Sequence, residues 1–191
     1  MRTPANPAVF LDYASTRADI RDGDILLYES DTFYSRIIKK VTHSRYTHAG
    51  IAVWWFERLM VMEAVGSGVG VTPLSVGIKK HKARVHWFTA VRPLTEEQRR
   101  QMIMKGQEEL GKKYDLWHAI WVGIKLLFNW EPERRDALRK EKKFFCSAYV
   151  AHVYNACGID LKCGLSDSSM VPEDIATSTE LTDRGILKNM E

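Results

Sequence analysis

The chain has 191 residues, of which 45% are hydrophobic and 27% are charged, and its formal net charge is +4. This length and composition predict one domain with a substantial hydrophobic core, and they exclude disordered and collagen-like classes of protein. The small positive excess comes without an arginine-rich run, zinc-finger spacing or an aromatic RNA-binding signature. We therefore expect a solvated basic face and no nucleic-acid partner.

The start of the chain does not resemble a secretory signal peptide, because its longest apolar run, Ala8 to Leu11, is followed at once by Asp12. We expect a protein that is cytoplasmic, or that is delivered without a signal peptide, for instance with a phage. The most apolar stretch, residues 116–128, has 13 residues, whereas about 20 are needed to span a bilayer. This stretch predicts a buried helix and no transmembrane segment. The alternative is a helix on the membrane surface, helped by the basic segment at 131–143.

The histidines and cysteines do not have the spacing of a metal site or a disulfide framework. The three cysteines form no CxxC pair, and the six histidines form no HExxH motif. At least one thiol should be free, and no metal or organic cofactor is predicted. The cysteines are Cys146, Cys157 and Cys163.

Between Asp24 and about Pro93 the chain consists of short segments rich in β-branched and aromatic residues, each bounded by Gly, Pro or charged residues. This pattern predicts an antiparallel sheet. The predicted strands are DILLY, YTHAGIAVWW, RLMVMEAV, GVGVTPL and RVHWFTAVR. One helix, FYSRIIKKVT, is predicted after the first strand, with Asp31 or Thr32 as its N-cap.

From Thr95 onward the pattern is helical. A capping box of Thr95 and Gln98 begins a helix that should end at Gly111. Two further helices are predicted at about 114–129 and 146–156 from their apolar faces.

The tail from Gly158 is predicted to be irregular. Strands followed by helices predict an α+β architecture, with helices on one side of a mostly antiparallel sheet.

Cys146 is a candidate nucleophile because it lies in the first turn of a predicted amphipathic helix, directly after two lysines and two phenylalanines. The positive end of the helix dipole and nearby cations lower a cysteine pKa from its usual value of about 8.5 and favour the reactive thiolate. The same backbone N–H groups could stabilise an oxyanion. The alternative is a buried cysteine that only fills space in the core. Cys157 and Cys163 have no comparable setting and are predicted to be structural.

His48 is the histidine best placed to act as the base, since it begins an apolar strand and is followed by two small residues, Ala49 and Gly50. In the next predicted strand an acid, Glu63, interrupts an apolar run. The remaining histidines have no such acidic partner in the sequence; they are His43, His81, His86, His118 and His152.

Two registers of the predicted hairpin place His48 and Glu63 on one face of the sheet. A loop at residues 55–56 puts position 48 opposite 63, and a loop at 56–57 puts 48 opposite 65, with 63 as its neighbour on the same face. Glu63 could then accept a hydrogen bond from His48 and orient it as the third member of a triad. The alternative is an edge glutamate that pairs with a surface lysine.

Five segments of this chain resemble the circularly permuted NlpC-type papain-like peptidases, over about residues 23–177. They are RDGDILLY, FYSRIIKKVTHSRYTHAGIAV, MEAV, GKKYDLWHA and FFCSAYVAHVYNACGIDL. In the permuted branch the histidine strand comes first and the cysteine helix comes last, as in this sequence. The resemblance implies a permuted papain-like fold, with an antiparallel or barrel-like half first and the nucleophile helix last.

The resemblance also implies roles for single residues. Cys146 would be the nucleophile, His48 the base and Glu63 the orienting residue, and Tyr114 of the GKKYD segment would bind substrate. The Gly23–Asp24 pair would have a structural role at the start of the first strand.

Three functions are compatible with these patterns. The leading hypothesis is a cysteine hydrolase that cleaves a peptide or isopeptide bond, with a peptide or cell-wall fragment as its substrate. The second is a thiol acyltransferase or lipid hydrolase at the membrane surface, of the type related to lecithin:retinol acyltransferase. The third is a catalytically silent binding module. The oligomeric state is not indicated by the sequence.

Overall fold

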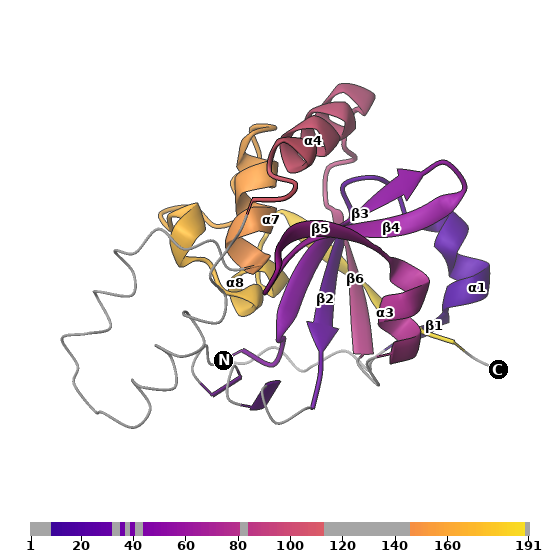
Figure 1. Ribbon diagram of the computed structural model, residues 1–191. Helices are drawn as coiled ribbons and strands as arrows, with labels where there is room; N and C mark the ends of the chain where they lie inside the picture. Colours follow the sequence, from indigo (N-terminus) through magenta and orange to yellow (C-terminus); the bar gives the residue numbers. More distant parts are fainter. Residues whose placement is uncertain are drawn as a thin grey trace.

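A seven-stranded sheet forms the centre of the computed structural model, which describes residues 9–31, 35–36, 39–40, 44–80, 84–112 and 146–189 (Figure 1). Its strand order is β1-β7-β6-β2-β3-β4-β5. The strands are β1 (Phe10–Asp12), β2 (Ile25–Glu29), β3 (His48–Trp55), β4 (Arg58–Val65), β5 (Gly68–Pro73), β6 (Arg84–Ala90) and β7 (Leu181–Lys188). The β1–β7 pair is parallel, and the other neighbouring pairs are antiparallel.

Helices cover both faces of this sheet (Figure 1). One face carries α4 (Glu96–Glu108), α7 (Cys146–Asn155) and α8 (Pro172–Ala176), and the other carries α1 (Tyr13–Thr16) and α3 (Leu74–Lys80). The described part also contains two short 3-10 segments, η1 (Arg17–Asp19) and η3 (Asp167–Ser169). The prediction that all helices lie on one side was therefore wrong, because the short α1 and α3 have too few residues to show a helical period.

The five strands predicted from Asp24 to Pro93 coincide with β2 to β6. Strand β2 is buried on both faces, with Ile25, Leu26 and Leu27 fully inaccessible, which explains its unbroken apolar sequence. The helix predicted from Thr95 is α4, and Thr95 and Gln98 form the expected capping box. The architecture is α+β, as predicted.

The end of the chain differs from the prediction. Residues after Gly158 include α8 and the eight-residue strand β7, so α7, which carries the predicted nucleophile, is not the last element. The sequence LTDRGILK does not alternate, because three consecutive residues of β7 are exposed and the β6–β7 ladder contains an irregularity at Trp87. The paired residues of β6 and β7 are about 100 positions apart in the sequence, so their pairing leaves no pattern within either segment. The described strands also form an open sheet with β1 and β5 at its edges rather than a barrel.

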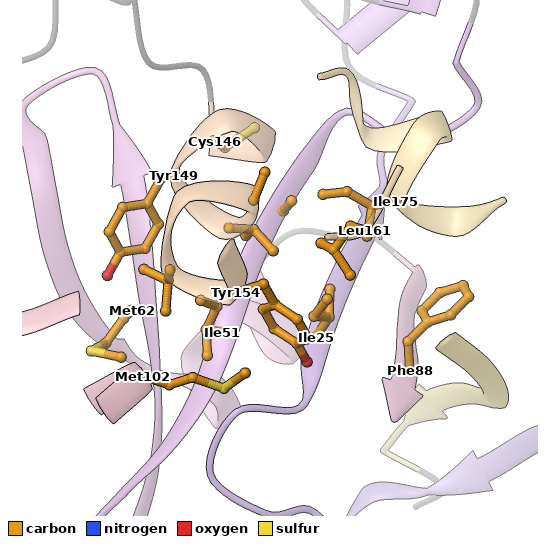
Figure 2. Close-up of a cluster of buried hydrophobic side chains, with 14 of the residues drawn as sticks. Ile25, Ile51, Met62, Phe88, Met102, Cys146, Tyr149, Tyr154, Leu161 and Ile175 are labelled. Atoms are coloured by element: carbon orange, nitrogen blue, oxygen red, sulfur yellow. The ribbon is translucent and has the colours of Figure 1, made fainter. Parts of the chain in front are cut away.

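Helix α7 packs against the sheet through one continuous hydrophobic cluster (Figure 2). Tyr149 and Tyr154 are fully buried and face Ile51 and Met62 of the central strands. The hydroxyl of Tyr154 donates to the carbonyl of Gly23, and that of Tyr149 donates to the carbonyl of Gly106. These two hydrogen bonds fix the position of α7 along the sheet, with Cys146 in the first turn of the helix.

The Gly23–Asp24 pair has a structural place at the start of β2. Gly23 has a positive φ of 89°, and a Cβ there would lie 2.8 Å from the sulfur of Met102. Asp24 is buried and accepts hydrogen bonds from the backbone N–H of Arg21 and from Nε1 of Trp87. Burial, against these donors, raises the pKa of Asp24 to about 6.

Several predictions fall on residues outside the described part. These are the helix at 114–129, the apolar stretch at 116–128 and Tyr114. Of the predicted helix FYSRIIKKVT, residues 35–36 and 39–40 are described and are helical. Among the helices of the described residues, none combines the length and the hydropathy needed to cross a membrane.

Candidate active site

His48 and Glu63 meet across the β3–β4 hairpin. Strand pairs Gly50–Glu63 and Trp55–Arg58 establish the second of the two predicted registers, with a loop at residues 56–57. Glu63 is therefore the diagonal neighbour of His48 on the same face of the sheet. Nε2 of His48 lies 2.6 Å from Oε2 of Glu63. The Glu63 carboxylate is buried, with 10% of its side chain exposed. The imidazole thus donates its Nε2 proton to a shielded carboxylate, which leaves Nδ1 to serve another group.

Gly50 makes this diagonal contact sterically feasible. It lies directly opposite Glu63, and a Cβ at position 50 would come within 2.4 Å of a methyl group of Val61 and 3.4 Å of Cβ of Glu63. A side chain there would displace its neighbours on β4. Gly50, one of the two small residues after His48, thus leaves room for the His48–Glu63 contact.

Cys146 is the first residue of α7, and its side chain lies near His48, so that each group shifts the pKa of the other. The next residue, Ser147, is fully buried and donates its hydroxyl proton to the carbonyl of Met170. That bond ties the start of α7 to the chain segment before α8. The backbone N–H groups of Ala49 and Ser147 lower the pKa of the Cys146 thiol. The structure therefore brings Cys146, His48 and Glu63 together in that order.

The electrostatics of this row favour a charged pair. Burial alone would raise the pKa of the Cys146 thiol, but the imidazolium of His48 and the two backbone N–H groups lower it overall. Burial alone would lower the pKa of His48, but the thiolate and Glu63 raise it to about 10. Between these two pKa values the site holds a thiolate beside an imidazolium, which is the reactive form of a cysteine nucleophile.

Two further residues complete the site and were not identified from the sequence. The Tyr28 ring lies beside the His48 ring, with 5.4 Å between ring centroids, and Tyr28 is paired with His48 in the β2–β3 ladder. The Thr72 hydroxyl donates to Oε1 of Glu63. A two-residue loop at 66–67 sets the β4–β5 register, and the Gly-Ser pair at that loop is the signal that could have placed Thr72 near Glu63.

The other cysteines have no comparable setting. All three thiols are free, where the odd number of cysteines required at least one. Cys157 is buried at the end of α7, where its Sγ lies 3.4 Å from the carbonyl oxygen of Gln98, and burial raises its pKa. Cys163 is exposed.

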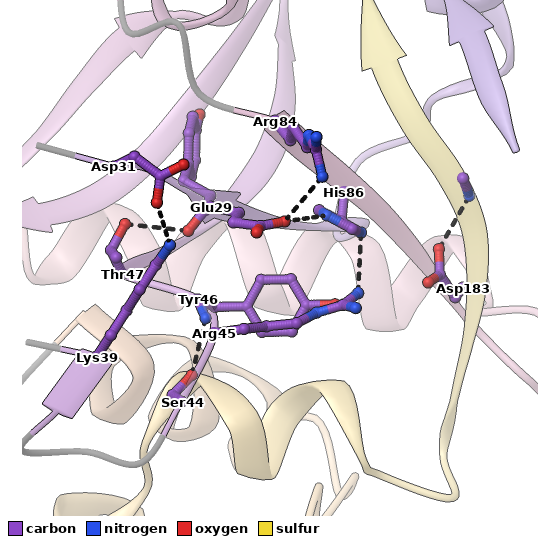
Figure 3. Close-up of polar contacts among 12 residues, drawn as sticks. Glu29, Asp31, Lys39, Ser44, Arg45, Tyr46, Thr47, Arg84, His86 and Asp183 are labelled. Carbon is purple, nitrogen blue, oxygen red and sulfur yellow. Dashed lines mark hydrogen bonds and ion pairs between the residues drawn. The ribbon is translucent and has the colours of Figure 1, made fainter. Parts of the chain in front are cut away.

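Two other described histidines do have acidic neighbours, which the sequence did not reveal. His152 lies 3.9 Å from Glu109 and 3.8 Å from Asp167. His86 on β6 is buried, with Nε2 3.4 Å from Glu29 and Nδ1 3.4 Å from Arg45 (Figure 3).

The His86 cluster has a structural place next to the site. Burial and the Arg45 charge lower the pKa of His86, so this imidazole stays neutral. Tyr46 packs edge-on against His86, and the guanidinium of Arg45 lies over the Tyr46 ring (Figure 3). Glu173 of α8 accepts from the backbone N–H of Arg45. These contacts anchor the residues that lead into His48.

The sequence matches, over residues 19–165, the family described as permuted papain-like amidase enzyme, YaeF/YiiX, C92 family. The chain belongs to this family. This confirms the resemblance to circularly permuted papain-like enzymes that the order of the histidine and cysteine segments indicated.

Two similar proteins show how much of the chain is matched. The chain is 30% identical over 139 residues to the "uncharacterized protein YiiX" of Escherichia coli strain K12, which corresponds to 72% of this chain and 59% of that protein. It thus spans less than two thirds of the length of this relative. The crystal structure of the metalloprotein yiiX from Escherichia coli O157:H7 has a similar fold, with a TM-score of 0.64. The match covers 87% of this chain and 97% of that chain at 23% identity.

The thiolate–imidazolium pair predicts how Cys146 reacts with iodoacetamide as the pH changes. The Cys163→Ser variant, which lacks the exposed thiol, is the starting protein. Its Cys146 should still be alkylated rapidly well below pH ~8.5, the usual pKa of a cysteine thiol. In His48→Ala the imidazolium no longer offsets the effect of burial, so the pKa of the Cys146 thiol should rise. At neutral pH its alkylation should therefore be at least about tenfold slower, the factor that one pKa unit gives.

Tandem mass spectrometry of the alkylated protein separates Cys146 from Cys157. Equal profiles for the two proteins, or faster labelling of Cys157, would contradict the pairing of Cys146 with His48.

Proposed function

We propose that this protein is a cysteine hydrolase that cleaves an amide bond, either peptide or isopeptide, with Cys146 as nucleophile, His48 as base and Glu63 as orienting residue. The observation that carries the proposal is the continuous row from the Cys146 thiol through His48 to the Glu63 carboxylate. Membership of an amidase family supports the same class of reaction.

The proposed reaction proceeds in two steps. The Cys146 thiolate attacks the carbonyl carbon, and the resulting oxyanion is stabilised by backbone N–H groups at the start of α7. As the C–N bond breaks, the His48 imidazolium donates its proton to the leaving amine, and a thioester remains on Cys146. Water then loses a proton to His48 and attacks the thioester, which releases a carboxylic acid and restores the thiolate–imidazolium pair. Glu63 keeps the imidazole in the orientation that both proton transfers require.

We propose peptides derived from peptidoglycan as the substrate class. The basis is the resemblance of the motif order to NlpC-type enzymes, which act on cell-wall peptides. The membrane-surface acyltransferase was motivated by residues 116–128, which lie outside the described residues, and no feature of the described part favours it over an amidase.

The metal implied by the description of yiiX as a metalloprotein has no matching donor set in the described part of this chain. Within those residues, no three His, Cys, Asp or Glu side chains are grouped so that they could hold a metal ion. In the site itself, Nε2 of His48 is occupied by the Glu63 carboxylate, and His48 and the Cys146 thiol shift each other's pKa. The proposed reaction is formulated with the side chains of Cys146, His48 and Glu63 alone.

Replacement of the nucleophile should remove the activity. Cys146→Ala leaves no group to form the thioester, so hydrolysis of cell-wall peptides should fall by at least about 1000-fold. Cys157→Ala, just beyond the end of α7, is the matched control and should retain activity, because the Cys157 thiol lies against the backbone carbonyls of Gln98 and Val153. Turnover of tripeptide and tetrapeptide fragments, followed by chromatography, measures both. Retained turnover in Cys146→Ala would disprove the assignment.

Chelation should leave the activity unchanged. The proposed acid, base and nucleophile are side chains of the protein, so dialysis against EDTA followed by the same assay should give the wild-type rate. A loss of activity that added Zn²⁺ or another divalent cation restores would contradict the metal-free reaction.

A further inference from the structure

Four neighbouring strands each contribute one side chain to a row that includes the catalytic pair. Tyr28 comes from β2, His48 from β3, Glu63 from β4 and Thr72 from β5. We propose that Thr72 is a positioning residue of the active site: its hydroxyl holds one carboxylate oxygen of Glu63 so that the other stays on His48. This inference rests on the proposed function, because it assigns Thr72 a role in the same site.

The sheet register places Thr72 for this contact. Glu63 lies directly opposite Gly50 on β3 and directly opposite Gly70 on β5. Neither glycine has a side chain that could reach the carboxylate. His48 and Thr72, which do reach it, are each two residues away from those glycines, in opposite directions along β4. Glu63 is therefore held from both sides along its own strand.

The two carboxylate oxygens have separate partners. Oε2 accepts the Nε2–H of His48 at 2.6 Å, and Oε1 accepts the hydroxyl proton of Thr72. The terminal torsion of a glutamate is broad and roughly two-fold, so a single hydrogen bond restrains it poorly. Donors on both oxygens define the plane of the carboxylate. The Thr72 hydroxyl thus limits rotation that would move Oε2 away from His48.

A purely structural role for Thr72 makes a different prediction. Thr72 is exposed on the surface strand β5, where valine has an equal or better strand propensity. A threonine that only supports the fold would change the melting temperature when replaced, without changing the titration of His48. A positioning residue changes the His48 pKa and kcat.

The test uses Thr72→Val, which keeps the shape of the side chain and removes the donor, and Thr72→Ser, which keeps the donor. Thr182→Val makes the same chemical change at an exposed position of β7 in the same sheet and serves as control. The His48 pKa is followed by NMR of its ring carbon, and kcat and KM are measured on a cell-wall peptide.

In Thr72→Val the His48 pKa should fall, because the Glu63 carboxylate spends less time on Nε2. We expect kcat to fall about tenfold with KM nearly unchanged, since misorientation of a catalytic group affects the chemical step. Thr72→Ser should restore both values, and Thr182→Val should match the wild type.

An unchanged His48 titration in Thr72→Val would overturn the inference, whether or not the melting temperature changes. The titration needs no substrate, so the inference is tested separately from the proposed function. If the wild type hydrolyses no peptide but Thr72→Val still lowers the His48 pKa, the proposed function fails and the positioning of Glu63 stands. If the wild type is active and the titration does not move, only the role of Thr72 fails.

Discussion

The contact between Nε2 of His48 and Oε2 of Glu63 depends on one register of the β3–β4 hairpin. Because side chains alternate along a strand, a slip of one residue would place Glu63 on the opposite face and leave a buried carboxylate without its partner. The loop at residues 56–57 sets this register, with Phe56 in the left-handed region at a φ of 53°. Gly50 then leaves the space through which the diagonal contact forms. The orientation of the imidazole is thus a property of the sheet.

The thiol reaches this imidazole through the packing of α7 on the same sheet. Hydrophobic burial holds the helix against the strands, but it is non-directional and does not by itself define how far the helix slides. Three hydrogen bonds along α7 fix its position: from Ser147 to the carbonyl of Met170, from Tyr149 to that of Gly106, and from Tyr154 to that of Gly23. The last of these links α7 to the chain just before β2. The Gly23–Asp24 pair therefore influences the site through the position of the helix, at a distance from the reacting atoms.

Sequence patterns predicted the parts of this structure that depend on local order. The short β-branched and aromatic segments of β2 to β6 and the capping box of α4 were visible because each is encoded within a few residues. Strand β7 was missed because its ladder with β6 is long-range and its exposed residues break the alternation. Cys146, His48 and Glu63 stood out as polar or reactive groups in apolar segments. Thr72 did not, because a threonine in a strand is ordinary and its importance comes from the β4–β5 register.

The most direct measurement of the central claim is capture of the acyl-enzyme. Wild-type protein is mixed with a peptide substrate, quenched in acid during turnover and digested with trypsin, which releases residues 144–162 as one peptide containing Cys146 and Cys157. Tandem mass spectrometry should locate an acyl group on Cys146, and Cys146→Ala should carry none. Hydrolysis without any acyl adduct under these conditions, or an adduct on Cys157, would contradict a mechanism in which Cys146 is the nucleophile.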